Sequence, residues 1–336
     1  MPSRSCVVSE LDRIADEILD RIPLEKLEGR TALLTGASGL VGTTLSRVLA
    51  RAPLKQLFLQ TRSGFLHKPP ENATVIYADL ANANDCARLP NADIIISGAN
   101  YGQPLRFMAD PLLALRSASY GLLALLEKCN VGGRFLFLSS SEVYIDSPYP
   151  PPLKEDQIGV IDPYHPRACY IMGKLYGEAM THLYRGKGIS TVTVRHGITY
   201  GPGARRGDKR SWASFVERAV ITRRLELLDG GSAVRGFCYM TDGVEMILRA
   251  LLDGTQPVYN IAGKDNLSIR ELAEAVCEIA PANLVTPSND DRGVKGTPMD
   301  VRLDASRINN EFGKTDFVPF AEGMRRTIDW WRATYG

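Results

Sequence analysis

The chain begins with apolar residues that recur every three or four positions, the spacing of one face of an α-helix. These residues are Val7, Leu11, Ile14, Ile18 and Ile22, and Pro23 follows where such a helix should end. The stripe predicts an N-terminal helical extension, residues 1–28, that packs on the body of the protein or on a partner subunit.

From residue 31 the pattern changes to short apolar runs that alternate with helical segments. Helical runs such as 43–52 and 115–129 separate the apolar ones. The alternation predicts βαβ units, hence an α/β fold with a doubly wound parallel sheet and helices on both faces. The apolar runs compatible with buried strands are 31–34, 56–60, 74–78, 93–97, 134–139, 190–194 and 257–262.

The remaining segments, 200–256 and 263–336, are rich in helical patterns and carry a Gly- and Arg-rich loop, "GPGARRGDKR". We expect them to form a smaller, helix-rich substrate lobe over the carboxyl edge of the sheet, where ligands of such folds bind. The sheet domain would then comprise residues 29–199, joined by the late strand at 257–262.

Composition narrows the class of protein. The chain has 336 residues, of which 44% are hydrophobic and 23% charged, and its formal net charge is +2. This charge gives no sign of a polyanionic partner such as nucleic acid. No apolar run is long enough to span a membrane. The six cysteines form no C-x-x-C pair, which favours free thiols in a reducing compartment over a zinc site or disulfides. We therefore expect a cytoplasmic protein without a metal site.

A glycine-rich turn follows the first predicted strand and opens a helix. Gly36, Gly39 and Gly42 have the spacing G-x-x-G-x-x-G. The first glycine permits a tight turn, the second lets backbone N–H groups approach a pyrophosphate, and the third lets helix and strand pack closely. In this strand–turn–helix context the turn predicts dinucleotide binding.

The acidic residue that usually contacts the adenosine ribose is missing. No Asp or Glu lies between Gly29 and Pro70. Arg62, at the end of the second strand, is placed to meet a 2′-phosphate, to stack on adenine or to face solvent, so both NAD and NADP stay open. Asp79, after the third strand, either contacts adenine or starts a turn.

Tyr170 and Lys174 lie four residues apart in a helical segment and therefore on one face. A nearby ammonium and a positively charged nicotinamide ring favour the tyrosine phenolate. Such a tyrosine can take the proton of a secondary alcohol while the carbon is oxidised. The residues predicted to bind the cofactor are Gly36, Ser38, Gly39, Leu40, Val41, Gly42, Arg62, Asp79, Leu80, Ala99, Tyr170 and Lys174.

From Thr31 onward the sequence resembles the extended short-chain dehydrogenase/reductases that modify nucleotide-sugars. The stretches that carry this resemblance are "TGASGLVG", "SSSEVY", "PRACYIMGK", "YGPG", "VRGFCYMTD", "YNIAG" and "DVRLDASR". The resemblance implies that Tyr170 is the base at the sugar C4 hydroxyl, that Lys174 holds the ribose, and that Ser140 hydrogen-bonds the reacting oxygen. The substrate contacts that we predict with it are Ser141, His196, Arg210, Arg235 and Arg302, although His196 could equally be a buried, satisfied histidine.

Glu142 is a carboxylate at the end of a buried strand, where an unpartnered charge would be costly. Simple 4-epimerases of the family usually lack an acid here, whereas the 4,6-dehydratases have one. The triplet Ser140–Ser141–Glu142 is most similar to the Thr-Ser-Glu of the UDP-glucuronate decarboxylases. The resemblance therefore implies a catalytic Glu142 that acts at C5 or C6 after C4 has been oxidised.

The leading hypothesis is decarboxylation of a nucleotide-hexuronate by a homodimer, with a 4,6-dehydratase or an epimerase as alternatives. A non-catalytic dinucleotide sensor is a different class, but such proteins commonly lose the tyrosine or the lysine, and both are present here. Departures from the family pattern surround the substrate rather than the cofactor. Ile198 replaces the usual asparagine, Ile171 and Met172 replace Asp-Glu, and Ile145 replaces a glycine.

Overall fold

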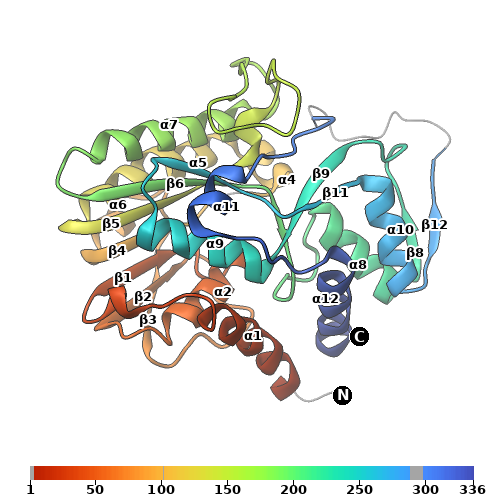
Figure 1. Ribbon diagram of the computed structural model, residues 1–336, viewed down its shortest axis with the longest axis horizontal. Coiled ribbons are helices and arrows are strands. Elements are labelled where there is room, and N and C mark those ends of the chain that lie inside the picture. Colours follow the sequence, from red (N-terminus) through yellow and green to blue (C-terminus); the bar gives the residue numbers. More distant parts are fainter. Residues whose placement is uncertain (1–3, 101, 288–297) are drawn as a thin grey trace.

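The computed structural model describes residues 4–100, 102–287 and 298–336, and the side chains from residue 10 onward. Val7 of the predicted apolar stripe therefore lies outside the described side chains. The chain folds around a seven-stranded parallel sheet with a smaller lobe at one end of it (Figure 1). The strands of this sheet are β1 (Thr31–Thr35), β2 (Gln56–Thr61), β3 (Ala73–Tyr77), β4 (Ala92–Ser97), β5 (Cys129–Ser140), β6 (Ser190–His196) and β10 (Val258–Ile261).

The strand order is β10-β6-β5-β4-β1-β2-β3, and every pairing is parallel. The predicted doubly wound α/β fold and its apolar strands are confirmed. The order reverses at β1, whose neighbours are β2 and β4, so the crevice at this switch point is where a dinucleotide is expected. β5 begins at Cys129, five residues earlier than predicted, because an irregular register between Ala92 and Ile94 lets the glycine-containing stretch 129–133 join the sheet.

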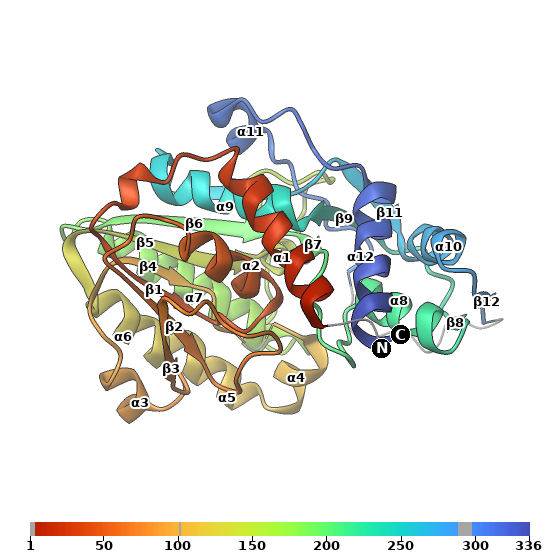
Figure 2. The same cartoon turned by 90° about the horizontal axis from the view of Figure 1, so that it is seen from below.

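Helices cover both faces of the sheet (Figure 2). One face carries α1 (Arg4–Leu19), α2 (Leu40–Leu49) and α9 (Met240–Asp253), which contact one another. The helical segments of the other face or its edges are α3 (Ala83–Ala87), α4 (Pro104–Ala109), α5 (Pro111–Arg116), the π-helical turn η2 (Ser117–Gly121), α6 (Leu122–Glu127) and α7 (Ala168–Tyr184). Two short 3₁₀ turns are η1 (Glu25–Leu27) and η3 (Ser141–Tyr144).

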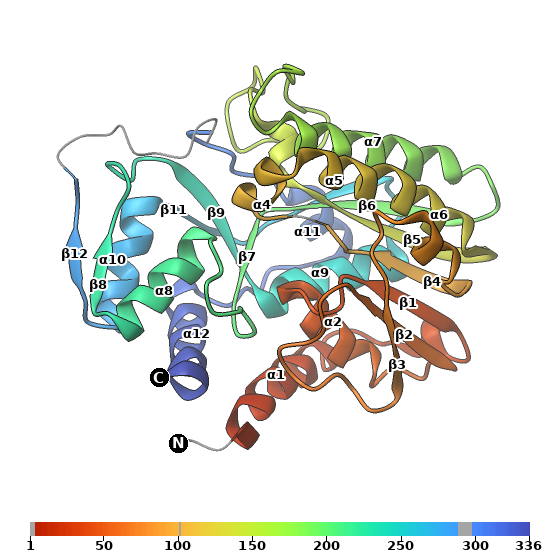
Figure 3. The ribbon, with the colours of Figure 1, turned by 180° about the vertical axis from the view of Figure 1, so that it is seen from behind.

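The smaller lobe holds two short sheets with helices packed against them (Figure 3). Its three-stranded sheet joins β7 (Ile198–Tyr200), β9 (Val234–Tyr239) and β11 (Asp265–Ser268), and a two-stranded sheet joins β8 (Arg224–Glu226) and β12 (Asn283–Val285). The helices that follow β7, β11 and β12 in the chain are α8 (Ser211–Ile221), α10 (Ile269–Ile279), α11 (Ser306–Phe312) and α12 (Phe320–Tyr335).

The predicted border between sheet domain and lobe stays a prediction. α8, α10 and α12 contact one another within the lobe. α9, although it falls in the segment assigned to the lobe, packs against β5, β6 and β10 of the large sheet, and α11 packs against β10. The chain thus returns to the sheet twice after leaving it, and the two parts share one continuous apolar core.

The N-terminal helix packs on the protein's own body. Leu11, Ile14 and Ile18 are fully buried, and α1 contacts α2, α9 and α12. The helix ends at Leu19, three residues before the last member of the predicted stripe, yet Ile22 in the following turn is still buried. α1 therefore bridges the large sheet and the lobe, because α12 belongs to the lobe.

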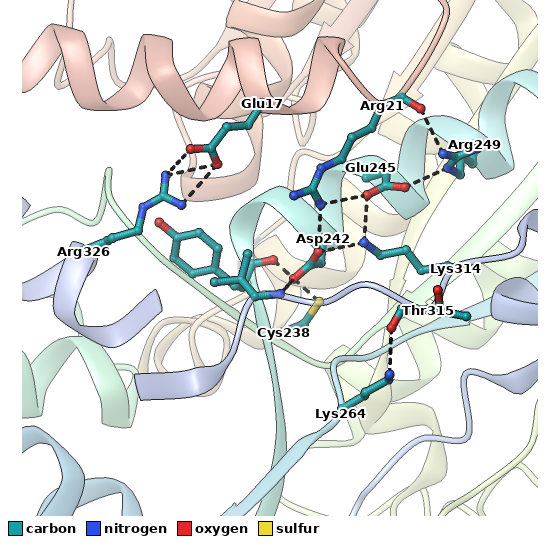
Figure 4. Close-up of polar contacts among 12 residues, drawn as sticks. Glu17, Arg21, Cys238, Asp242, Glu245, Arg249, Lys264, Lys314, Thr315 and Arg326 are labelled. Atoms are coloured by element: carbon teal, nitrogen blue, oxygen red, sulfur yellow. Dashed lines mark hydrogen bonds and ion pairs between the residues drawn. The ribbon is translucent and has the colours of Figure 1, made fainter. Parts of the chain in front are cut away.

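Ion pairs reinforce this bridge (Figure 4). Arg326 of α12 pairs with Glu17 of α1 at 3.0 Å. One turn further along the chain, just after α1 ends, Arg21 reaches Asp242 and Glu245 of α9, which are almost completely buried. Lys314 donates to the same two carboxylates at 2.9 Å each. The two buried carboxylates of α9 are therefore neutralised by cations from both ends of the chain.

Within the described part of the chain, no helix is both long and apolar enough to cross a bilayer. The side chains of five of the six cysteines are described, and all five are free thiols.

Candidate functional site

A large cleft of about 1170 Å³ lies at the carboxyl edge of the sheet and is also lined by residues of the lobe. Its walls include the ends of β1, β4 and β5, the start of α2, the first half of α7 and the loop 203–211. All but one of the residues predicted to form the site line this cleft.

The glycine turn between β1 and α2 forms one wall, and its geometry fits a pyrophosphate. Gly36 has a φ of +69°, and a Cβ there would lie 2.8 Å from the backbone of Ala99. A Cβ on Gly42 would lie 2.1 Å from the carbonyl oxygen of Gly36. Gly39 caps the ten-residue α2, and Gly39, Leu40 and Val41 line the cleft, so the N-terminus of this helix faces the cleft.

The end of β2 shapes the neighbouring part of the cleft. Gln60 accepts a hydrogen bond from the Gly36 N–H at 3.0 Å and donates to the Ala78 carbonyl at 2.6 Å, which ties three loops together. Arg62 lines the cleft, and its guanidinium lies 4.0 Å from the carboxylate of Asp79. The predicted cofactor residues that also line the cleft are Ser38, Leu40, Val41, Leu80 and Ala99.

α7 presents Tyr170 and Lys174 on one face, as the four-residue spacing predicted. Both side chains are buried, and the Tyr170 ring stacks on Phe107 with 4.6 Å between ring centroids. The Lys174 ammonium donates to the carbonyl oxygen of Leu138 in β5 and lies 4.9 Å from the ring of Phe137. The helix thus fixes the phenol and the ammonium against the end of the sheet.

Burial dominates the protonation of this pair. It raises the pKa of Tyr170, and the charge of Glu142 raises it further, whereas a hydrogen bond with Ser140 and the charge of Arg167 lower it. Burial also lowers the pKa of Lys174 to about 7. The sequence predicted a tyrosine pKa lowered by the ammonium and a nicotinamide ring. The protein alone raises the pKa of Tyr170 instead of lowering it. A lowered tyrosine pKa would therefore require the positive ring of a bound cofactor.

β5 ends at Ser140, and the chain then turns through η3, which carries Ser141 and Glu142 into the cleft. The Ser140 hydroxyl accepts a hydrogen bond from the backbone N–H of Glu142 at 3.2 Å, which caps the turn. This cap explains how a carboxylate can follow a buried strand: the turn directs it out of the core and onto the cleft wall.

Sequence reasoning missed Arg167, which is three residues before Tyr170. Its side chain is buried and lines the cleft, where it forms a two-point ion pair with Glu142. The signal was present in the "PRACYIMGK" stretch, but nothing in the sequence shows that this arginine meets a glutamate 25 residues away.

A second arginine that sequence reasoning missed, Arg205, lies in the Gly- and Arg-rich loop after β7. Its guanidinium donates to the carbonyl oxygens of Gly64 at 2.7 Å and Ser38 at 3.5 Å. The loop is thereby tied to the glycine turn, which brings one end of the lobe to the cofactor side of the cleft.

Four of the predicted substrate contacts lie outside the turn after β5, namely His196, Arg210, Arg235 and Arg302. The first three line the cleft, and Arg302 does not. His196 lines it, and burial lowers the pKa of its imidazole to about 4, so it is neutral. Arg210 pairs with Asp208, and Arg235 donates to the carbonyl oxygens at 298 and 299. Arg302 is not part of the cleft wall, because its guanidinium turns to Asp300 at 2.8 Å.

Comparison of the sequence with known proteins gives a consistent result. Residues 32–262 match the NAD dependent epimerase/dehydratase family. The chain is 26% identical over 321 residues to UDP-glucuronic acid decarboxylase 1 of Xenopus tropicalis, which covers 92% of this chain and 74% of that protein. It is also 28% identical over 329 residues to a dTDP-4-dehydro-6-deoxy-D-allose reductase of a Streptomyces species, which covers 92% and 98% of the two chains.

Among solved structures, the fold matches UDP-glucose 4-epimerase of Thermotoga maritima with a TM-score of 0.81 and 21% identity. The match covers 91% of this chain and the whole of the other. At this identity the likeness shows the fold, and the predicted parallel-sheet architecture with its C-terminal lobe agrees with it.

Proposed function

Because the chain belongs to the NAD dependent epimerase/dehydratase family, we propose that it oxidises a nucleotide-sugar at C4 with tightly bound NAD or NADP. It then removes CO₂ from a hexuronate such as that of UDP-glucuronate. The observation that carries this proposal is Glu142, a carboxylate on the cleft wall beside the Tyr170–Lys174 pair. The name of the Xenopus relative, a UDP-glucuronic acid decarboxylase, supports the same substrate.

The residues of the cleft fit a nicotinamide dinucleotide. The glycine turn has no side chain that would obstruct a pyrophosphate, and the N-terminus of α2 provides a favourable field for it. Lys174, Arg62 and Asp79 all line the cleft. In the proposed complex Lys174 would hold the ribose, and Arg62 and Asp79 would meet the adenosine end. NAD or NADP bound there would supply an acceptor for the hydride of C4 and a donor of the same hydride at the end, so that the reaction would be redox-neutral overall.

In the first step the Tyr170 phenolate takes the proton of the C4 hydroxyl while C4 becomes a ketone. Ser140 hydrogen-bonds the same sugar oxygen and so holds it within reach of Tyr170. Lys174 keeps its ammonium near the phenol and favours the phenolate form. This role requires a protonated Lys174, whose pKa of about 7 in the free protein lies close to neutrality.

In the second step the bond between C5 and C6 breaks. Its electron pair moves into the C4–C5 bond as an enolate, which the C4 ketone stabilises, and C6 leaves as CO₂. C5 then takes a proton. Glu142 is placed to act at C5 or C6 in this step, which explains why the site has a carboxylate that C4 oxidation alone does not need.

Two alternative enzymes that would use the same residues are a 4,6-dehydratase and an epimerase. The solved structure from Thermotoga maritima is named as an epimerase, which supports the second alternative. A third is a one-way reductase of a 4-keto sugar, which the Streptomyces relative suggests. A non-catalytic dinucleotide sensor is a different class, and the intact Tyr170 and Lys174 speak against it. A reductase would consume one reduced cofactor per turnover, whereas a decarboxylase would consume none.

The test is to incubate the purified protein with NAD or NADP, each in its oxidised and its reduced form, and a panel of UDP-, dTDP-, GDP- and CDP-sugars that includes uronates and 4-keto sugars. Products are then read by mass. Loss of CO₂ from a uronate is the expected result. Loss of water would indicate a dehydratase, unchanged mass an epimerase, and gain of two hydrogens a reductase.

We also infer that the protein forms a homodimer. Large apolar side chains are exposed on the neighbouring segments α5, η2 and α7, among them Leu112, Tyr120 and Tyr176. A second copy is the occupant that the family resemblance implies for such a surface. Sedimentation of the purified protein should give twice the chain mass of 36.9 kDa, and a monomer at micromolar concentration would contradict the inference. The cytoplasmic location stays a prediction.

A further inference from the structure

Arg167 and Glu142 form a closed ion pair on the wall of the cleft. The Arg167 Nε atom lies 2.8 Å from Glu142 Oε2, and its Nη2 atom donates to Oε1, so the guanidinium holds the carboxylate at two points. The Arg167 side chain is only 6% exposed and that of Glu142 19%. Both residues nevertheless line the cleft, so the pair lies where a ligand would reach it.

The surroundings place this pair next to the reacting groups. The Arg167 guanidinium lies 5.5 Å from the centre of the Phe107 ring, and the same ring stacks on Tyr170 with 4.6 Å between centroids. Arg235 is buried on the same wall, and the positive charge of Arg167 contributes to lowering its pKa, after burial. The carboxylates of Glu142 and Asp300 act in the opposite direction and raise the pKa of Arg235.

We propose that Arg167 binds the carboxylate of the sugar and that Glu142 occupies this position in the free protein. A guanidinium holds any carboxylate in the same planar, two-point geometry. A uronate can therefore take the place of Glu142 on Arg167 without leaving the buried cation unpaired, which would be strongly unfavourable. The displaced Glu142 is then free to turn toward C5. The inference rests on the proposed function, because it assumes a uronate substrate.

The exchange predicts opposite effects for the two partners on substrate affinity. Glu142→Gln removes the competing carboxylate, so UDP-glucuronate should bind about tenfold more tightly or better. Arg167→Gln removes the cation, so UDP-glucuronate should bind at least about tenfold more weakly. UDP-glucose, which has a hydroxymethyl group instead of the carboxylate, should bind equally to all three proteins.

Calorimetric titration of the NAD-loaded protein with UDP-glucuronate, UDP-glucose and UDP measures these affinities. Arg302→Gln is the matched control, since that arginine also pairs with a carboxylate but lies outside the cleft wall, and it should change none of them. If Arg167→Gln does not fold, Arg167→Lys serves instead. It keeps the charge but loses the two-point geometry, and it should retain only part of the preference for the uronate.

The inference is wrong if Arg167→Gln keeps the wild-type preference for UDP-glucuronate over UDP-glucose. It is also wrong if Glu142→Gln binds UDP-glucuronate more weakly than wild type, or if the wild type has no such preference. Failure of the proposed function looks different: the wild type would then bind the uronate through Arg167 but release no CO₂. Release of CO₂ with an unchanged preference in Arg167→Gln would instead reject the role of Arg167 alone.

Discussion

The burial of Lys174 should make the protein less stable than a variant without this charge. The side chain is 4% exposed, and burial lowers its pKa to about 7 from about 10.4 in an unfolded chain. The folded state binds the proton of Lys174 less tightly than the unfolded chain does. Burial of the Lys174 ammonium therefore opposes folding most strongly below pH 7. The penalty disappears as the pH rises from 7 toward 10.

The size of the effect follows from the two pKa values. Their difference corresponds to at most about 4–5 kcal/mol of stability at pH 6. Lys174→Met keeps most of the apolar stem and removes the charge, but it also removes the hydrogen bond to the Leu138 carbonyl, worth about 1 kcal/mol. We therefore expect Lys174→Met to be about 2–4 kcal/mol more stable than wild type at pH 6 and no more stable at pH 10.

Urea unfolding of both proteins at a series of pH values gives this difference directly. Other titrating groups cancel in the comparison because they are common to the two proteins. Lys154→Met is the matched control, since Lys154 is exposed, and its stability should follow wild type within about 0.5 kcal/mol at each pH. A Lys174→Met variant that is less stable than wild type by the same amount at pH 6 and pH 10 would refute the reasoning.

The remaining predictions concern single side chains. Tyr170→Phe should keep the fold and cofactor affinity but lose at least about 10²-fold in turnover, since only the proton acceptor is removed; near-normal turnover would reject Tyr170 as the base. Arg62→Ala should weaken NADP by about 10- to 100-fold and NAD much less if Arg62 meets a 2′-phosphate; equal weakening in calorimetry would indicate adenine stacking. Arg326→Ala should lower the free energy of unfolding by about 1–3 kcal/mol, because it leaves Glu17 without a two-point partner. The exposed Arg332→Ala should change it by less than about 1 kcal/mol, and equal effects of the two would show that α1 is not held by this pair.

The fold could be predicted from the sequence because buried parallel strands leave an unambiguous pattern. Each strand of the large sheet contains a short apolar run, helical segments separate all of them except β2 and β3, and the glycine turn fixes where the first βα unit begins. The pattern could not show where β5 begins, because residues 129–133 join the sheet through an irregular register rather than through apolar side chains. Nor could it show that α9 returns to the large sheet, since its buried face would fit either part of the protein.

The candidate site was predictable where its residues share one element. Tyr170 and Lys174 meet because they are one helical turn apart, and Ser140 to Glu142 follow one strand. The pair of Arg167 with Glu142 depends on two elements meeting, which no local pattern records. Arg302 shows the opposite case: its stretch resembles the family, but its guanidinium pairs with the carboxylate of Asp300, two residues away, and lies outside the cleft wall.

The central claim is that C4 oxidation precedes a second step that needs the carboxylate of Glu142. The most direct measurement follows reduced nicotinamide by its absorbance and CO₂ by mass in single turnovers of UDP-glucuronate, with wild type and Glu142→Gln. We predict that wild type releases one CO₂ per sugar, whereas the variant reduces its bound cofactor and then stalls without CO₂. Release of CO₂ by Glu142→Gln at the wild-type rate would contradict the account, and so would a wild type that reduces its cofactor but leaves the uronate carboxylate in place.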